Sequence, residues 1–594
     1  MAVNDTIEPN APAYLHHSSS SEAGPDVKTA VPDQYAIDPE KQSTHVGSLR
    51  ADSESSDQPR RGPVYAFVKR HWKVVFQVVG FLLMTVWWIY GLVKYRHEDG
   101  KGWLIPSLIY IALCLRVFFN FVPQTLVMRP VRAVWQLTAG RVYDLTPKKL
   151  RQPLAGFVTV AVFIIGTMVS EETGDNTRGN RGISLFGLVV LLFVLTITSR
   201  NWKIIPWHTV IGGMLSQFII ALFVLRTEAG YDIFKFISDM ARELLGFAKD
   251  GLIFLTSEEF AASPWFFTSV IPAIIFFIAL VQMLYYVGFL AWFIQKFATF
   301  FFWSLRVSGA EAIVAAATPF IGQGESAMLI RPFMDELTLA EIHQIMTCGF
   351  ATIAGSVLVA YIGMGLNPQA LVSSCIMSIP ATLAVSKMRF PETRVPVTAG
   401  KVEVPKSEED EKTVNALHAF TNGSWLGLKI GATIVACLLT MIAAVALVNG
   451  LLGWWGGYWG LDGEIHPKLS LQLILSYLLW PVAWLLGVPK GDCLKVGELI
   501  GMKIVVNEFV AFDSLVKVPR FIEMAPRSKL IATYACCGFG NIGSLGIQIG
   551  VLSQISPRRS GDVVKVSISA FVSGVLCTLT SASVAGMLFH DGMI

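Results

Sequence analysis

The chain has 594 residues, of which 53% are hydrophobic and only 15% are charged, and its mean hydropathy is +0.54. A soluble protein carries about a quarter charged residues, so much of this surface faces something other than water. The net charge of +4 gives no support to nucleic-acid binding. The eight cysteines have neither disulfide nor metal-ligand spacing, which favours buried packing thiols. The composition therefore indicates a membrane protein.

Residues 1–72 are expected to form a disordered cytoplasmic tail. Up to residue 63 this segment is rich in Ser, Asp, Glu and Pro, and such a stretch buries too little surface to offset its ordering entropy. Its first residues lack the pattern of a cleavable signal. Basic residues cluster ahead of the first span, at Arg60, Arg61, Lys69, Arg70 and Lys73. By the positive-inside rule, they place the N-terminus in the cytoplasm.

Apolar segments long enough to cross a membrane follow the tail. They lie near 74–93, 103–122, 154–170, 183–199 and 204–225, and, after the middle of the chain, near 427–453, 468–487, 531–553 and 563–588. Residues 226–252 instead place charges between apolar residues at helical spacing, which predicts an amphipathic helix along the membrane. The apolar run over 266–303 is longer than one crossing needs. Residues 391–426 form a hydrophilic loop.

The chain carries an internal repeat. Residues 348–356 read CGFATIAGS and residues 537–544 read CGFGNIGS, and each follows a carboxylate in apolar surroundings, Glu325 or Glu508. Duplicated halves with interrupted helices are typical of secondary transporters, whose substrate binds where unwound backbone faces a cavity. Irregular backbone at membrane depth persists only where it lines a cavity or is buried in protein. The repeat therefore predicts a transporter.

Glu325 and Glu508 are the strongest candidates for function. A carboxylate within a span costs about 2.5–3.5 kcal/mol even on a mild insertion scale, so its presence indicates a role. The alternative is that each glutamate lies in an aqueous loop. Buried carboxyl groups could accept ribose hydroxyls, or either could carry a coupling proton, because burial favours the neutral form.

Further polar residues surround these carboxylates. Gln323 offers a donor and an acceptor together, which suits a nucleobase edge. Asn541 and Ser544 are within reach of one ligand, and Phe539 either stacks on it or packs the core. Oxygens that could ligate a small cation at the broken helices belong to Thr318, Ile321, Thr352 and Ile353. Walker, dinucleotide and nucleophile-elbow motifs are missing from the sequence, which argues against an ATP-driven pump and against an enzyme. We expect no metal centre, since His343 has no second ligand at helical spacing.

Four motifs together resemble the concentrative nucleoside transporter family: GQGESAMLIRPF (322–333), GFATIAGSVLVAYIG (349–363), NEFVAF (507–512) and CGFGNIGSLGIQIG (537–550). The resemblance implies an all-α polytopic membrane protein of about eleven transmembrane helices. It also implies inverted repeats, two re-entrant helical hairpins, two unwound transmembrane helices and a homotrimer in lipid.

On this resemblance we divide the chain into parts. Extra N-terminal transmembrane helices, similar to those of eukaryotic members, occupy 73–172, and scaffold helices occupy 173–303. The first transport repeat spans 304–390, a further scaffold helix with its connection spans 427–467, and the second transport repeat spans 468–594.

The resemblance also assigns the substrate site. Gln323 and Glu325 at the first hairpin would contact the base, with Val357 nearby. Glu508 at the second hairpin would hold the ribose. It would act with Phe539 and with the pair Asn541 and Ser544.

Two departures from the family pattern bear on substrate and ion. Gly324 stands where the family often has threonine, which removes one contact to the base. Thr318 stands where sodium-coupled members have asparagine, and the lost amide carbonyl favours protons over sodium as the coupling ion. Gly322 and Ser356 resemble the pattern of members that accept purine nucleosides and uridine.

We therefore expect a fungal-like, proton-coupled symporter of the plasma membrane that imports nucleosides by alternating access without an organic cofactor. Sodium coupling is the alternative. A passive pore for small polar solutes is the alternative from another class of protein.

Overall fold

The computed structural model describes residues 63–94, 146–169, 176–263, 265–398, 413–461 and 468–590, with a few single positions between 107 and 174. Its contacts separate one unit, Met1–Gly140, from a second, Arg141–Ile594. In the first unit, helix α1 (Pro63–Lys94) covers the first predicted span. Within that unit, Trp88 stacks on Tyr110 with ring centroids 4.5 Å apart.

The predicted end of the tail at residue 72 is wrong, because α1 already begins at Pro63. Proline suits the first position of a helix. A helix nucleated by an apolar span also extends at little cost into the flanking basic residues, since propagation is easier than nucleation. Residues 1–62 and most of the predicted span at 103–122 lie outside the described residues.

The second unit opens with helices that match the next predicted segments: α5 (Lys148–Met168), α6 (Arg178–Ile197), α7 (Trp207–Arg226) and the amphipathic α8 (Glu228–Leu255). The short helices η4 (Trp202–Ile204), α9 (Glu258–Ala262) and α10 (Phe266–Ser269) lie between or after them. The long apolar run that follows forms two helices, α11 (Ile271–Tyr286) and α12 (Phe289–Leu305), bent by 80°. Gly288 makes this bend with φ of +83°, a value that glycine adopts without strain.

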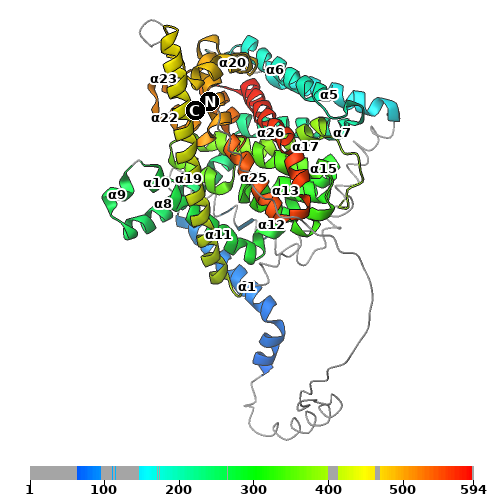
Figure 1. Cartoon of the computed structure of the whole chain (residues 1–594). Coiled ribbons are helices and arrows are strands. Elements are labelled where there is room, and N and C mark those ends of the chain that lie inside the picture. The colour runs from blue at the N-terminus through cyan, green and yellow to red at the C-terminus, as the bar shows by residue number, and fades with distance from the viewer. Residues whose placement is uncertain are drawn as a thin grey trace, which may run out of the picture. The chain divides into compact units, whose positions relative to one another are not determined.

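Helix α19 (Ala416–Tyr458) pairs with α11 (Figure 1). Gly423 and Gly427 face its backbone so closely that a Cβ atom on either would lie 2.7 Å from a Cα atom of α11. Small residues four apart allow such close helix packing in membranes. The predicted hydrophilic loop, 391–426, therefore ends too late. Asn415 caps α19 by accepting a hydrogen bond from the His418 amide at 2.8 Å, and this cap starts the helix ahead of its apolar part.

The two transport repeats contain matching helices. The first consists of α13 (Gly309–Ile321), α14 (Glu325–Met328), η5 (Arg331–Glu336), α15 (Leu339–Ala351), α16 (Gly355–Gly363) and α17 (Pro368–Arg389). The second consists of α20 (Leu471–Leu485), η6 (Lys490–Asp492), α21 (Cys493–Val505), α22 (Glu508–Lys517), α23 (Pro519–Ile522), α24 (Pro526–Cys536), α25 (Ile542–Ile555), η7 (Pro557–Arg559) and α26 (Ser560–Leu588). In each repeat a helical hairpin precedes a helix pair broken by a short extended segment, and a long helix closes the repeat.

The long helices α17 and α26 pack the two repeats together. Helix α26 of the second repeat contacts both α15 and α17 of the first. Within the described residues, seven helices are long and apolar enough to span a membrane, or eight if α11 and α12 form one bent span. The helices at the breaks, such as α13 and α25, are shorter apolar segments. The structure is that of a polytopic α-helical membrane protein.

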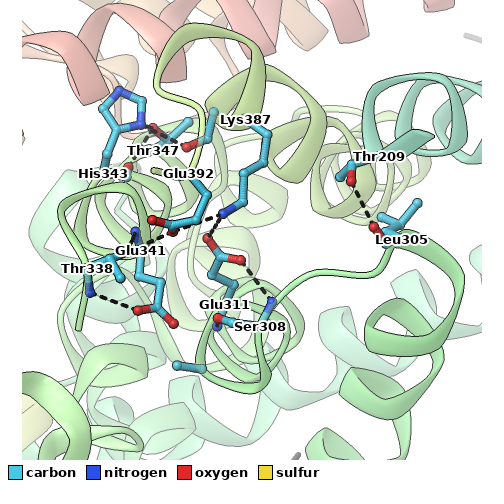
Figure 2. Close-up of polar contacts among 12 residues, drawn as sticks. Thr209, Leu305, Ser308, Glu311, Thr338, Glu341, His343, Thr347, Lys387 and Glu392 are labelled. Atoms are coloured by element: carbon cyan, nitrogen blue, oxygen red, sulfur yellow. Dashed lines mark hydrogen bonds and ion pairs between the residues drawn. The ribbon is translucent and has the colours of Figure 1, made fainter. Parts of the chain in front are cut away.

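A buried charge cluster fastens the start of α13 to the end of α17 (Figure 2). Lys387 Nζ lies 2.6 Å from Glu311 and 3.6 Å from Glu392, and the Glu311 side chain is fully buried. Glu311 also accepts the Ser308 amide at 3.0 Å and so forms a capping box. Thr338 and Glu341 make the same box at the start of α15. The cluster therefore holds three helices of the first repeat in one arrangement.

Candidate substrate and cation site

Glu508 is the centre of a buried hydrogen-bond network. It is the first residue of α22, directly after the turn of the second hairpin, and only 3% exposed. Tyr361 of α16 donates its hydroxyl to one carboxylate oxygen at 3.0 Å, and Asn541 donates its amide to the other at 2.8 Å. Each carboxylate oxygen accepts one hydrogen bond from the protein and has a second lone pair, so the group can also accept hydrogen bonds from a ligand.

The break between α24 and α25 brings Asn541 to this network. Asn541 is the N-cap of α25, and its side-chain oxygen accepts the Ser544 amide at 2.7 Å. The helix cap therefore fixes the side chain so that its NH2 group points at Glu508. Phe539, 8% exposed, lies in the extended segment just before the cap. The structure thus brings together the predicted ribose residues Glu508, Asn541 and Ser544.

The first hairpin places Gln323 beside a second glutamine. A Cβ atom on Gly349 would lie 2.9 Å from Gln323 Cβ and 2.5 Å from Gln548 Nε2, so both side chains meet at this glycine. The amide oxygen of Gln323 and both polar atoms of Gln548 are buried without a hydrogen-bond partner among the described residues. Gln548 follows Ser544 by four residues, so the two share one face of α25.

For two further predicted residues, the structure gives the position in a helix but, within the residues that it describes, no side-chain contact to the network. Glu325 begins α14, but its side chain lies outside the described residues. Val357 is buried in α16, four residues before Tyr361 and therefore on the same helix face.

The candidate cation residues lie at the ends of α13 and α15. Thr318 is fully buried in the last turn of α13, with its hydroxyl 2.6 Å from the Val314 carbonyl and 3.1 Å from Ser326 Oγ. Thr352 ends α15, and its hydroxyl donates to the Cys348 carbonyl at 2.9 Å. Ile321 ends α13, and Ile353 is buried in the break between α15 and α16. A Cβ atom on Gly355 would lie 2.9 Å from the Phe320 carbonyl oxygen, so the hairpin end touches the break.

The two breaks are joined by a hydrogen bond. The Phe539 amide in the second break donates to the Thr352 carbonyl in the first at 3.2 Å. The carbonyl of a candidate cation residue therefore contacts the backbone of a candidate substrate residue. The described residues include no group of three or more His, Cys, Asp or Glu side chains that could hold a metal ion.

Sequence reasoning missed Tyr361 and Gln548. Both lie inside motifs that the resemblance used, yet Tyr361 reads as packing and Gln548 as one polar residue in an apolar helix. The helical spacing of Gln548 from Ser544 was the available signal for the glutamine. Nothing in the sequence around Tyr361 indicates a partner that lies 147 residues away.

Two repeats, each with a hairpin and a broken helix, that meet at a buried carboxylate are the architecture typical of secondary transporters. Comparisons with known proteins show the family. Three family models match the chain: "Na+ dependent nucleoside transporter N-terminus" over 186–259, "Nucleoside recognition" over 267–367 and "Na+ dependent nucleoside transporter C-terminus" over 370–586.

Relatives and solved structures agree with these models. The chain is 36% identical to "Solute carrier family 28 member 3" of Eptatretus stoutii over 73% of this chain and 64% of that protein. It is 33% identical to "Sodium/nucleoside cotransporter 2" of Rattus norvegicus over 73% of this chain and 66% of that protein. The "Structure of CNTnw in an inward-facing substrate-bound state" is 32% identical with a TM-score of 0.63, over 68% of this chain and 97% of that one.

The chain belongs to the concentrative nucleoside transporter family, whose members are transporters and not enzymes. It spans slightly less than two thirds of the length of these two relatives, 64% and 66%.

The preference for proton coupling is contradicted by these comparisons. Two of the three family models and the rat cotransporter are sodium-dependent by their descriptions, which favours the sodium alternative. Thr318 is a weak indicator of the coupling ion, because the missing amide carbonyl is only one of several possible oxygen ligands. The threonine hydroxyl and the backbone carbonyls of the breaks are also hard oxygen donors of the kind that half-helix ends offer to sodium.

Proposed function

We propose that the protein is a sodium-coupled symporter that imports nucleosides by alternating access. The observation that carries the proposal is the network of Glu508 with Tyr361 and Asn541 at the second break. It supplies a buried acceptor for the vicinal hydroxyls of ribose, at the end of a helix whose N-cap is fixed.

The nucleoside would lie along α25. The ribose would contact Glu508, Asn541 and Ser544, and the base would extend one helical turn further, to Gln323 and Gln548. Among the described residues, both glutamines leave amide atoms without a hydrogen-bond partner, and these atoms suit the donors and acceptors of a base edge. Glu325 and Val357 complete the base side in this proposal, and Phe539 lines the ribose side.

Sodium would bind where the end of α13 meets the break after α15, at oxygens of Thr318, Ile321, Thr352 and Ile353. The C-terminal ends of both half-helices point their partial negative charge at this place. Four further properties remain predictions: a preference for purine nucleosides and uridine, a homotrimer, a location in the plasma membrane and a cytoplasmic N-terminus.

Uptake of labelled uridine and adenosine tests the function. We expect cells that express the protein to accumulate both nucleosides above the outside concentration, and to lose this uptake when choline replaces sodium at constant pH. Amino acids and free nucleobases added in excess should not compete. Equilibration without accumulation would indicate a pore, and uptake that is unchanged in choline would contradict sodium coupling.

Gln548→Leu is expected to weaken nucleoside binding and yet to stabilise the protein. A lost hydrogen bond to the base costs about 0.5–1.5 kcal/mol, which raises Kd by roughly two- to tenfold. Burial of an unpartnered amide is itself unfavourable, so its removal should raise the thermal midpoint in detergent. Kd measured by calorimetry and the midpoint from thermal gel filtration check the two effects.

Gln217→Leu is the matched control for this variant, because Gln217 is a buried glutamine of α7 that donates to Ser581 at 2.9 Å. It should lower the midpoint and leave the nucleoside Kd unchanged. An unaltered Kd in Gln548→Leu would remove Gln548 from the proposed base site.

A further inference from the structure

Lys503 is a buried cation that the proposed site does not use. It lies in the last turn of α21, the first limb of the second hairpin, and is 1% exposed. Its ammonium donates to Thr578 Oγ1 of α26 at 3.3 Å. Among the described residues, this is the one hydrogen bond of the ammonium, which has three N–H donors. A single long hydrogen bond does not offset the free-energy cost of desolvating a buried charge, so the burial of this lysine needs an explanation.

The ammonium lies at the second break. A Cβ atom on Gly540 would be 3.1 Å from Lys503 Nζ, so glycine is what allows the close approach. One turn earlier on α21, the Leu499 carbonyl accepts the thiol of Cys536, the last residue of α24, at 3.7 Å. Lys503 and Leu499 share a face of α21, so the lysine faces the C-terminal end of α24. A helix C-terminus carries partial negative charge and favours a cation there.

The position matches the proposed sodium site of the first repeat. Thr318 lies in the last turn of α13 and Lys503 in the last turn of α21, and each of these helices has 13 residues. In both repeats this turn meets the break of the following helix pair. The first break would be neutralised by a sodium ion, whereas the second already holds an ammonium.

Glu508 links the ammonium to the substrate site through electrostatic interaction. It follows Lys503 by five residues, across the hairpin turn, and opposite charges on two residues so placed would attract each other. Within the described part of the chain, the carboxylate oxygens of Glu508 bond Tyr361 and Asn541, not the lysine. The ammonium therefore acts on Glu508 through space and leaves its lone pairs to a ligand.

We propose that Lys503 is the fixed cation of the second repeat and a positioning residue for the nucleoside. Its ammonium stands at the break between α24 and α25 as sodium would stand at the break between α15 and α16, and holds Asn541 and the Glu508 carboxylate in the arrangement proposed to bind ribose. This inference rests on the proposed function. It follows that the second break requires no mobile ion.

Nucleoside Kd and sodium activation of purified protein in nanodiscs test the inference. We expect Lys503→Met, which fills the space without charge, to raise the uridine Kd at least tenfold at every sodium concentration. Lys503→Ala opens the space to a second ion, so binding should return at high sodium with a steeper sodium dependence than in the wild type. Lys529→Met is the control, a half-buried lysine of α24 whose loss should change neither quantity.

Wild-type Kd together with wild-type sodium dependence in Lys503→Met would overturn the inference and leave the proposed function intact. Wild-type protein that bound no nucleoside would overturn both. If neither lysine variant folds, Thr578→Val decides, because it keeps the charge and removes the acceptor that holds it. A several-fold rise in Kd is expected, and an unchanged Kd would overturn the inference.

Discussion

Glu508→Gln should abolish concentrative uptake at low nucleoside concentrations without unfolding the protein. Glutamine can keep both neighbours, because its oxygen can accept from Asn541 and its amide can donate to a rotated Tyr361 hydroxyl. What is lost is the charge that strengthens hydrogen bonds from ribose hydroxyls. Hydrogen bonds to a charged group contribute about 1.5–3 kcal/mol, so Kd should rise roughly ten- to a hundredfold.

Asp513→Asn is the control for this variant, since it removes a carboxylate of the same helix that pairs with Lys517 at the surface. Its uptake should equal that of the wild type at equal surface expression. A second comparison separates ribose from base: 2′,3′-dideoxyuridine should bind wild type and Glu508→Gln with similar Kd. Full uridine uptake by Glu508→Gln would remove Glu508 from the site.

Lys387→Met should destabilise the protein more than any other single substitution considered. It leaves the fully buried Glu311 carboxylate without the cation that lies 2.6 Å away. An uncompensated buried charge costs about 3–5 kcal/mol. We expect a clear fall in the thermal midpoint in detergent, together with low surface expression.

The double variant Glu311→Gln, Lys387→Met should recover most of the loss, because glutamine can still accept the Ser308 amide and no charge is left unpaired. Lys517→Met is the control. It breaks an ion pair of similar length whose side chains are 60% and 47% exposed, and such pairs contribute less than about 1 kcal/mol. A double variant no more stable than Lys387→Met would show that the pair is not what stabilises the cluster.

The sequence predicts the repeats and much of the site because interrupted apolar helices leave local signals. The motif around Asn541 contains both the helix cap and the residue it caps, so its geometry is encoded within four residues. Helix ends are harder to predict. Ala416 starts α19 ahead of its apolar part because a single cap at Asn415 outweighs composition. In the proposed cation site the ion would be held by several oxygen ligands, so Thr318 alone cannot decide which ion binds.

Contacts between distant segments could not be predicted from the sequence. Tyr361 reaches Glu508 only because the two repeats pack against each other. Lys503 reaches Thr578 because the fold brings α21 beside α26 within the second repeat. A polar residue in an apolar helix gives no indication of its partner when the pairing depends on which faces of two helices meet. The charge cluster of Glu311 and Lys387 belongs to the same category, since 76 residues separate its members.

The hydrogen bond from the Phe539 amide to the Thr352 carbonyl has a thermodynamic consequence. An ion that draws on the Thr352 carbonyl polarises the peptide that Phe539 contacts, and a nucleoside that orders the segment around Phe539 orders that carbonyl in return. Linkage requires the two effects to be equal. If sodium raises the nucleoside affinity of the proposed symporter by some factor, the nucleoside must raise the sodium affinity by the same factor, and this peptide contact offers a route for that coupling.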